Sequence, residues 1–167
     1  MMVIRPAAPD DAAAIRRIHQ AAFAQVTEAD LVDALTKQGY VRLSLVAELD
    51  GQVVGHVLFS DIKIVTDGQT VDAVSLAPMA VLPEHQRKGI GSPLVEAGLQ
   101  RCREDGCCIV IVVGHPGYYP RFGFSPELAA PLKSEYSGEA FMAVELVPGA
   151  LDGVTGEVKY PLPFDAI

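Results

Sequence analysis

The chain has 167 residues, of which 50% are hydrophobic and 20% charged, a composition that fits a folded domain and excludes a disordered chain. Its 13 Lys and Arg against 21 Asp and Glu leave a net charge of -8, which argues against nucleic acid or an anionic membrane surface as a partner. No apolar stretch is long enough to cross a bilayer, and the first residues lack the features of a secretory signal. The three cysteines are an odd number and offer no disulfide framework. We therefore expect one domain over residues 1–167, located in the cytoplasm.

The first half of the chain predicts two helices followed by an antiparallel meander. Asp10 is expected to begin the first helix, and Gly39 to end the second. Asp50 and Gly51 form the strongest short signal for a hairpin turn. The expected elements are a strand at Val3–Arg5, helices at 12–23 and Glu28–Lys37, and strands at Leu43–Glu48, Gln52–Ile64 and Val71–Val81.

The second half predicts a strand–helix–strand unit. Apolar spacing indicates a helix over Gly89–Glu104, and the solid apolar run Cys108–Val113 is typical of a strand covered on both faces. With the strand before the helix these form a βαβ unit, so its two strands should be parallel. A later strand is expected over Glu139–Val147, and the Gly- and Pro-rich tail 148–167 should be a loop with one short strand near Val158.

A glycine loop lies between the strand and the helix of this unit. Gly89 and Gly91 allow the backbone to approach a ligand closely, and the first helical turn then offers free N–H groups to an anion. Arg87 and Lys88 add positive charge, so a phosphate or pyrophosphate is the expected ligand. Neither a Walker loop nor a dinucleotide fingerprint fits, because Leu94 stands where the fingerprint needs a small residue. Taken alone, the glycines are equally compatible with a packing turn.

A second motif follows the next strand, in the order Gly-His-Pro-Gly-Tyr-Tyr-Pro-Arg-Phe-Gly-Phe over residues 114–124. The order Q-R-K-G-I-G after one strand and Y-Y-P-R-F-G-F after the next strongly resembles the GCN5-related N-acetyltransferase (GNAT) superfamily. The amino-acid sequence of the second motif, with Phe141-Met-Ala-Val-Glu-Leu after it, is similar to the YhbS-like bacterial branch of this superfamily. The resemblance runs from about Val3 to Val147.

This resemblance implies an α/β GNAT fold with a mixed, mostly antiparallel sheet. The two parallel strands of the βαβ unit would be splayed, and the pantetheine arm of acetyl-CoA would enter between them. In the family, the strand before the glycine loop is bulged where it faces the arm, and the loop binds the pyrophosphate. The matching cofactor-binding positions here are Met79, Ala80 and Val81 at the bulge, Gln86, Arg87, Lys88, Gly89, Ile90, Gly91 and Ser92 in the loop, and Arg121 in place of the family lysine.

The resemblance also assigns the chemistry. Tyr119 matches the family tyrosine thought to protonate the departing CoA thiolate, whereas Tyr118 is expected to be a core aromatic. The general base stays open: Ser75 could hold a water molecule, and His115 could act as a neutral imidazole, although a structural role is favoured for it. His56 and His85 are interpreted as structural or exposed. No cluster has metal-ligand spacing, so no metal is expected.

The predicted function is acetyl transfer from acetyl-CoA to a primary amine of a small molecule or a protein, by direct attack in a ternary complex. An N–H of the bulged strand would stabilise the developing oxyanion, and Tyr119 would act as the acid. A non-catalytic acyl-CoA sensor, a longer acyl donor and an alcohol acceptor stay open as alternatives. A homodimer is possible.

Overall fold

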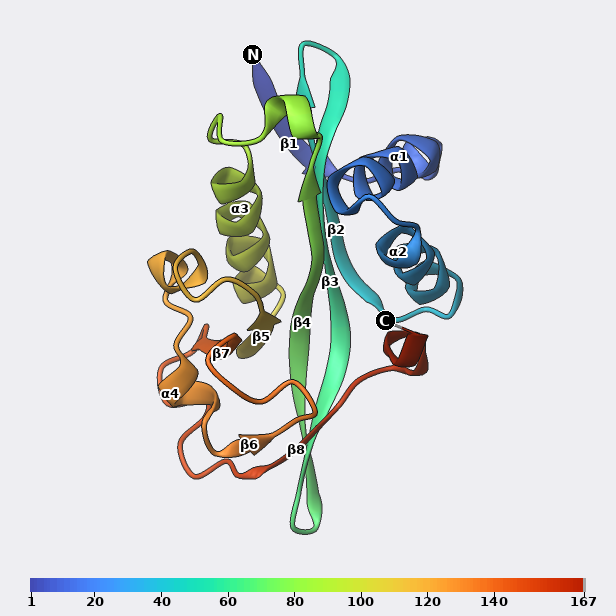
Figure 1. Cartoon of the computed structure of the whole chain (residues 1–167). Helices are drawn as coiled ribbons and strands as arrows, with labels where there is room; N and C mark the ends of the chain where they lie inside the picture. Colours follow the sequence, from blue (N-terminus) through green and yellow to red (C-terminus); the bar gives the residue numbers. More distant parts are fainter. Residues whose placement is uncertain (167) are drawn as a thin grey trace.

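The computed structural model describes residues 1–166 and has a twisted sheet with helices on both faces (Figure 1). Helix α3 covers one face, and α1 and α2 cover the other. The strands are β1 (Met2–Pro6), β2 (Val41–Leu49), β3 (Gln52–Thr66), β4 (Gln69–Val81), β5 (Ile109–Val113), β6 (Leu132–Lys133), β7 (Phe141–Glu145) and β8 (Gly156–Lys159). The helices are α1 (Ala12–Phe23), α2 (Thr27–Lys37), α3 (Gly91–Glu104) and α4 (Pro126–Ala129), with short 3-10 turns η1 (Pro9–Asp11), η2 (Pro83–His85), η3 (Tyr119–Phe122) and η4 (Leu162–Ala166).

The sheet confirms the predicted mixed topology. Its strands lie in the order β1-β2-β3-β4-β5-β7, and the βαβ unit makes β4 and β5 parallel while the other neighbours in this order are antiparallel. The tail supplies β8, which was expected near Val158 and pairs with β3 beyond the end of β2. The parallel pairing of β6 with β8 was not predicted.

Local turn chemistry explains how the meander is formed. Asp50 and Gly51 both have positive φ, 51° and 84°, which a two-residue hairpin turn of this type requires. The expectation that Asp10 begins α1 is wrong, because the chain enters that helix through η1 and Asp11 occupies the capping position. The Asp11 carboxylate accepts hydrogen bonds from the Ala8 N–H at 2.7 Å and from the Arg5 guanidinium at 2.8 and 3.0 Å. Asp11 therefore ties the start of α1 to β1.

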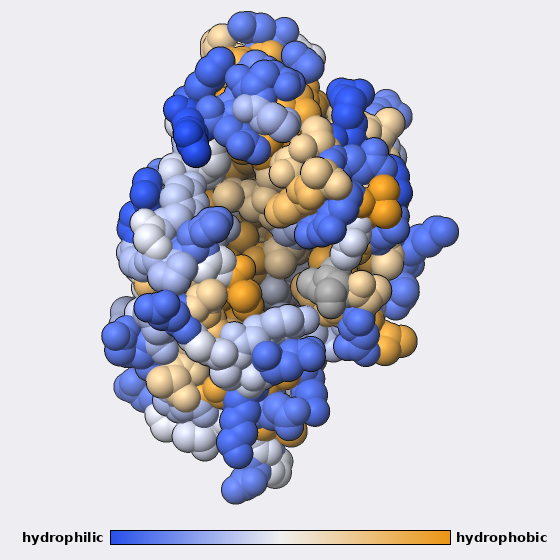
Figure 2. Space-filling view, in the orientation of Figure 1, coloured by the Kyte–Doolittle hydropathy of each residue, from blue (hydrophilic) through white to orange (hydrophobic). Residues whose placement is uncertain are grey.

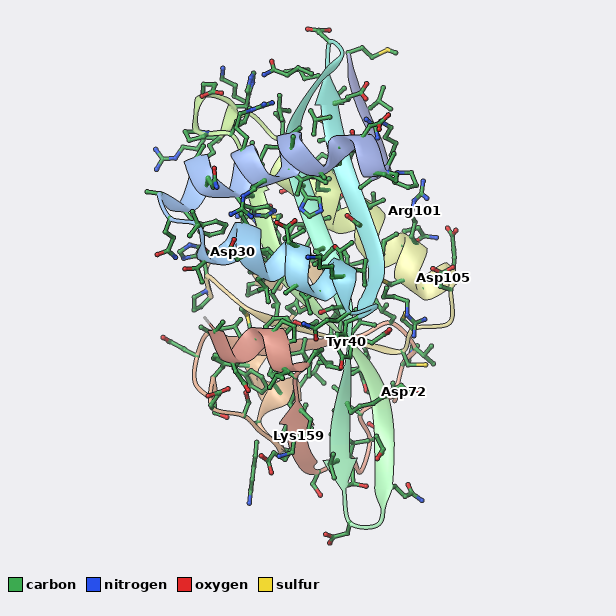
Figure 3. The ribbon with its side chains drawn as sticks, turned by 90° about the vertical axis from the view of Figure 1, so that its right-hand side faces the viewer. Asp30, Tyr40, Asp72, Arg101, Asp105 and Lys159 are labelled. Atoms are coloured by element: carbon green, nitrogen blue, oxygen red, sulfur yellow. The ribbon has the colours of Figure 1, made fainter. Side chains whose placement is uncertain are left out.

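Helix α3 lies close against the sheet because a glycine faces it. A Cβ atom built on Gly98 would lie 2.3 Å from Cε1 of Phe59, which is fully buried on β3. On β4, Leu76 is the partner of Phe59, so both side chains belong to the face that α3 covers. The neighbouring positions along each strand then belong to the face that α1 and α2 cover. Figure 3 shows this second face, with α1, α2 and η4 arranged above Lys159 of β8.

A buried pair of histidines lies beneath α1. His19 Nε2 and His56 Nδ1 share a hydrogen bond of 2.8 Å, and His56 Nε2 shares another of 2.8 Å with the Ser44 hydroxyl. Both rings are fully buried. Burial lowers the pKa of His19 to about 4 and, together with the neighbouring His19, that of His56 to about 3. The pair is therefore neutral at pH 7, as the structural interpretation of His56 predicts.

We predict that Gly98→Ala destabilises the protein by about 1–3 kcal/mol, because the added methyl group overpacks the contact with Phe59. Urea denaturation measures the loss. Gly117→Ala is the matched control, since no atom lies within 4 Å of the Cβ position there and the expected change is within about 0.5 kcal/mol. Equal effects of the two substitutions would contradict this packing interpretation.

We also predict that the free energy of unfolding falls as the pH drops from about 6.5 towards 4. Between these values the unfolded chain protonates both histidines and the folded chain does not, so protons favour unfolding by about 1.4 kcal/mol per pH unit for each neutral ring. The Asp11 carboxylate has a lowered pKa and stays ionised in this window. The double variant His19→Gln/His56→Gln should lose most of this slope, and an unchanged slope would show that other groups cause it.

Candidate active site

A gap opens between β4 and β5 beyond a short paired segment. The two strands pair only from Val74 to Leu76, opposite Val110 to Val112, although β4 continues to Val81. Past Leu76, the main-chain groups of β4 that point away from β3 have no strand partner in the part of the chain described. Figure 2 shows an apolar hollow in the middle of the face where these strands lie. The predicted splay of the two strands is therefore present.

The bulge of β4 lies earlier than predicted. Phe59 pairs with Leu76 and Val57 pairs with Met79, so Leu58 on β3 opposes two residues of β4, Ala77 and Pro78. The expectation that the bulge falls on Met79–Val81 is wrong, because the bulge lies on the two residues that precede Met79. The physical reason is Pro78, whose nitrogen has no hydrogen to donate to the ladder. Met79, Ala80 and Val81 instead pair regularly with β3 on the approach to the glycine loop.

The glycine loop forms a depression of about 350 Å³ at the start of α3. It brings together most of the predicted loop positions with Arg121 and adds two residues that were not predicted. The lining residues are Val81, His85, Gln86, Arg87, Gly89, Ile90, Gly91, Ser92, Tyr118 and Arg121. Of the remaining predicted site residues, Met79, Ala80, Lys88 and Tyr119 are outside this lining.

The loop is held in place by its own side chains and backbone. Gln86 Nε2 donates a hydrogen bond of 3.0 Å to the Val81 carbonyl, which fastens the loop to the end of β4. Arg87 and Gly89 take positive φ values of 62° and 78°, which produce the tight curl. In the first turn of α3, Gly91 and Ser92 carry N–H groups that have no helical partner, and both residues line the depression.

Tyr118 has a polar role that the sequence did not reveal. It was expected to be a core aromatic, but it is only half-buried and its hydroxyl shares a hydrogen bond of 3.0 Å with Ser92 Oγ. A Cβ atom on Gly91 would lie 3.2 Å from the same hydroxyl, so a side chain there would crowd it. The Arg121 guanidinium lies 4.5 Å from the centre of the Tyr118 ring, and its Nε donates to the Tyr118 carbonyl at 2.9 Å. Tyr118 therefore links Arg121 to the start of α3.

Tyr119 begins η3, the element that follows β5. Its side chain is buried at 8% exposure and packs so closely on Gly114 that a Cβ atom there would lie 2.4 Å from its ring. Burial, helped by Tyr118, raises the pKa of Tyr119 to about 12. The phenol therefore keeps its proton at neutral pH, as an acid must, although it is a weaker acid than an exposed tyrosine.

The two residues suggested in connection with the general base, His115 and Ser75, have different surroundings. His115 is exposed and follows β5 directly. Ser75 is buried on β4, opposite Ser60 of β3. Neither lies in the lining of the depression.

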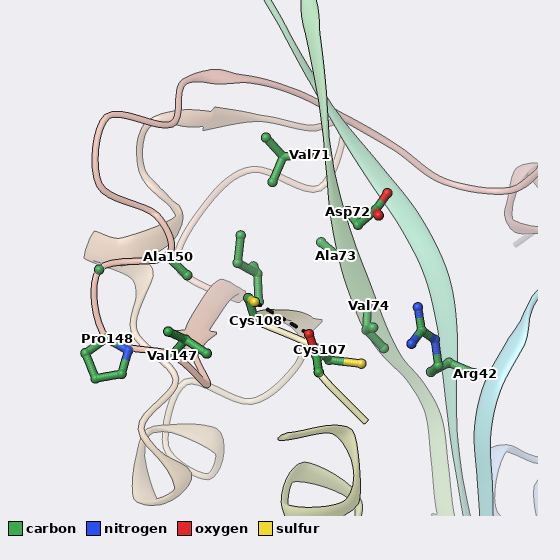
Figure 4. A pocket seen from close by; sticks show the side chains of 13 residues that line it. Arg42, Val71, Asp72, Ala73, Val74, Cys107, Cys108, Val147, Pro148 and Ala150 are labelled. Atoms are coloured by element: carbon green, nitrogen blue, oxygen red, sulfur yellow. Dashed lines mark hydrogen bonds between the residues drawn. The ribbon is translucent and has the colours of Figure 1, made fainter. Parts of the chain in front are cut away.

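A second cavity, of about 500 Å³, lies at the other end of the β4–β5 pair (Figure 4). Its charged groups are already paired: Arg42 Nε donates to Asp61 at 2.9 Å, and Asp72 accepts from Lys63. The thiols Cys102 and Cys107 near this end are buried, which raises the pKa of both, that of Cys102 to about 12. These thiols are therefore poor nucleophiles.

Residues 1–166 contain no group of three or more His, Cys, Asp or Glu side chains that could hold a metal ion. Over the same residues, none of the helices combines the length and apolarity needed to span a membrane.

Comparison with known proteins agrees with this geometry. Residues 3–126 match the family model described as an acetyltransferase (GNAT) domain. Over 164 residues the chain is 39% identical to the uncharacterized N-acetyltransferase YhbS of Escherichia coli strain K12, covering 95% of this chain and 96% of the relative.

Two solved structures have the same fold. The crystal structure of E. coli YhbS in complex with CoA superimposes with a TM-score of 0.91 at 35% identity, covering 98% of this chain and 92% of the other. A GNAT family acetyltransferase from Brucella melitensis in complex with acetyl-CoA gives 0.82 at 38% identity, covering 99% of both chains.

Proposed function

The chain belongs to the GNAT family of acetyltransferases, and we propose that it transfers the acetyl group of acetyl-CoA to a primary amine. The observation that carries this proposal is that one strand, β4, leads from the open gap directly into the anion-binding depression. An extended thioester with a pyrophosphate at one end has the shape to occupy both. The CoA and acetyl-CoA bound to the two relatives support the same choice of donor.

The depression would bind the pyrophosphate. Its donors are the N–H groups of Gly91 and Ser92 and the Tyr118 hydroxyl, and Arg87 and Arg121 add positive charge. We place Lys88 at the rim of this site, since it belongs to the same exposed loop. Gln86 acts indirectly, because its amide is bonded to the Val81 carbonyl rather than free for a ligand.

The unpaired edge of β4 would bind the pantetheine arm as an added strand. Met79, Ala80 and Val81 stay paired with β3, so their remaining main-chain groups are held in fixed directions. A preorganised N–H on this edge would stabilise the negative charge that develops on the thioester oxygen when the amine attacks. The chain would hold both substrates together, which makes attack effectively unimolecular.

Tyr119 would act as the acid for the CoA thiolate. Its position after β5 and its contact with Gly114 support a phenol held beside the gap, and burial keeps it protonated. The direct transfer leaves no acyl group on the protein, so no nucleophilic side chain is needed. This agrees with the buried state of Cys102 and Cys107.

Calorimetric titration tests the donor site. We expect micromolar binding of acetyl-CoA and none of ATP or NAD. Tyr118→Phe removes one hydroxyl from the depression, and we expect affinity for acetyl-CoA to fall about 2- to 10-fold with little change in kcat, since one hydrogen bond is lost. If the folded protein bound no acetyl-CoA, the proposal would be wrong.

Kinetics with a panel of amines test the chemistry. Tyr119→Phe should lower kcat about 10²-fold while the Kd for acetyl-CoA stays the same, because only the proton is lost. An unchanged kcat would exclude Tyr119 as the acid. The same panel, repeated with longer acyl-CoA thioesters and with alcohols, distinguishes the remaining donors and acceptors.

A further inference from the structure

Two consecutive tyrosines each lie against a glycine of a different element. The Tyr118 hydroxyl lies 3.2 Å from the position that a Cβ atom would take on Gly91, the first residue of α3. Cε2 of Tyr119 lies 2.4 Å from the corresponding position on Gly114, the residue that follows β5. Since a glycine has no side chain, each tyrosine can approach the backbone closely. The pair therefore connects the start of α3 with the end of β5.

The rings of the two tyrosines also contact each other, edge to face. The ring centres of Tyr118 and Tyr119 lie 5.1 Å apart, and the ring planes are inclined by 84°. Aromatic pairs favour this arrangement because the positive edge of one ring meets the negative face of the other. Tyr118 lines the depression at the glycine loop, whereas Tyr119 does not. The Tyr118 side chain thus contacts the depression on one side and the Tyr119 ring on another.

The Tyr118 ring is itself held by three neighbours. Its hydroxyl shares the hydrogen bond of 3.0 Å with Ser92 Oγ, and the Arg121 guanidinium lies over its face at 4.5 Å. The ring centre of Phe122 lies 5.3 Å away, with the planes inclined by 72°. A ring held at its hydroxyl, on its face and by a neighbouring ring cannot turn freely. Tyr118 therefore offers Tyr119 a fixed surface to pack on.

The orientation of the Tyr119 ring is set by packing. The ring of Phe124, which is buried, lies 5.8 Å from it at 84°, and Gly114 lies close against it. Tyr118 supplies a further side of this enclosure. A proton donor is effective only while its hydroxyl stays within hydrogen-bond reach of the leaving atom. An enclosure that restricts the ring therefore favours the transfer.

We propose that the ring of Tyr118 positions Tyr119 for proton transfer to the CoA thiolate, while the Tyr118 hydroxyl serves donor binding. This inference rests on the proposed acetyl transfer. The bond between the acetyl carbon and sulfur breaks as the bond to the amine nitrogen forms, and the sulfur keeps the electron pair and takes the Tyr119 hydroxyl proton. Solvent receives the proton released by the amine and returns one to the Tyr119 oxygen. Tyr118 exchanges no proton, so it is a positioning residue.

Kinetics and calorimetry together separate the two roles of Tyr118. Tyr118→Leu removes the ring and the hydroxyl, so we expect kcat to fall about 10-fold and the Kd for acetyl-CoA to rise about 2- to 10-fold. Tyr118→Phe is the matched control: it keeps the ring, and it should show the same rise in Kd with the kcat of the unaltered protein. Circular dichroism establishes that both variants are folded. Equal kcat values in the two variants would overturn the positioning role.

A double variant shows whether Tyr118 acts through Tyr119. In Tyr119→Phe no acid is left to position, so the addition of Tyr118→Leu should leave kcat at the value of Tyr119→Phe alone. A further 10-fold fall in the double variant would show that the Tyr118 ring acts by another route, and would overturn the inference while the proposed function stands. Failure of the unaltered protein to acetylate any amine would overturn the proposed function, and the positioning role with it.

Ring-flip rates measure the contact independently of turnover. In protein with ¹³C-labelled tyrosine, the Tyr119 signals are assigned by their loss in Tyr119→Phe. The Tyr119 ring should flip faster in Tyr118→Leu than in Tyr118→Phe, because only the first substitution removes the neighbouring ring. Equal flip rates in the two variants would show that the Tyr118 ring does not restrain Tyr119, and would refute the inference.

Discussion

The structure depends on the short parallel contact between β4 and β5. Phe59 fits against Gly98, which fixes α3 on one face, and Leu76 beside it is the last β4 residue that pairs with β5. Because this contact covers only three residues of each strand, the strands diverge immediately beyond it. The resulting gap is a property of the topology: a tightly packed helix holds the strands together at one point and leaves their edges free elsewhere.

Positive charge is concentrated at the depression where β4 meets the glycine loop. The protein carries a net charge of -8, yet the lining of the depression at the glycine loop contains Arg87 and Arg121 and no carboxylate. Tyr118 connects these features, since its ring lies beneath the Arg121 guanidinium and its hydroxyl bonds to Ser92. A local cationic site can thus persist in an acidic chain because helix geometry supplies part of the positive potential.

Features set by nearby residues were predictable from the sequence, and features set by distant contacts were not. The hairpin at Asp50-Gly51 and the glycine loop follow from backbone preferences of a few residues. The bulge at Ala77–Pro78 depended on the register of β3, although the proline was a visible signal. The role of Tyr118 depended on where α3 begins relative to the second motif, which spacing along the chain does not determine. The pairing of β8 joins segments about 95 residues apart, beyond the reach of local patterns.

The tail of the chain contributes to only one face of the sheet. Strand β8 and the buried Phe164 of η4 pack on the side of α2, while the glycine loop and Tyr118 lie against the start of α3. In evolutionary terms, the sequence of the tail and the sequence of the glycine loop therefore answer to different packing constraints.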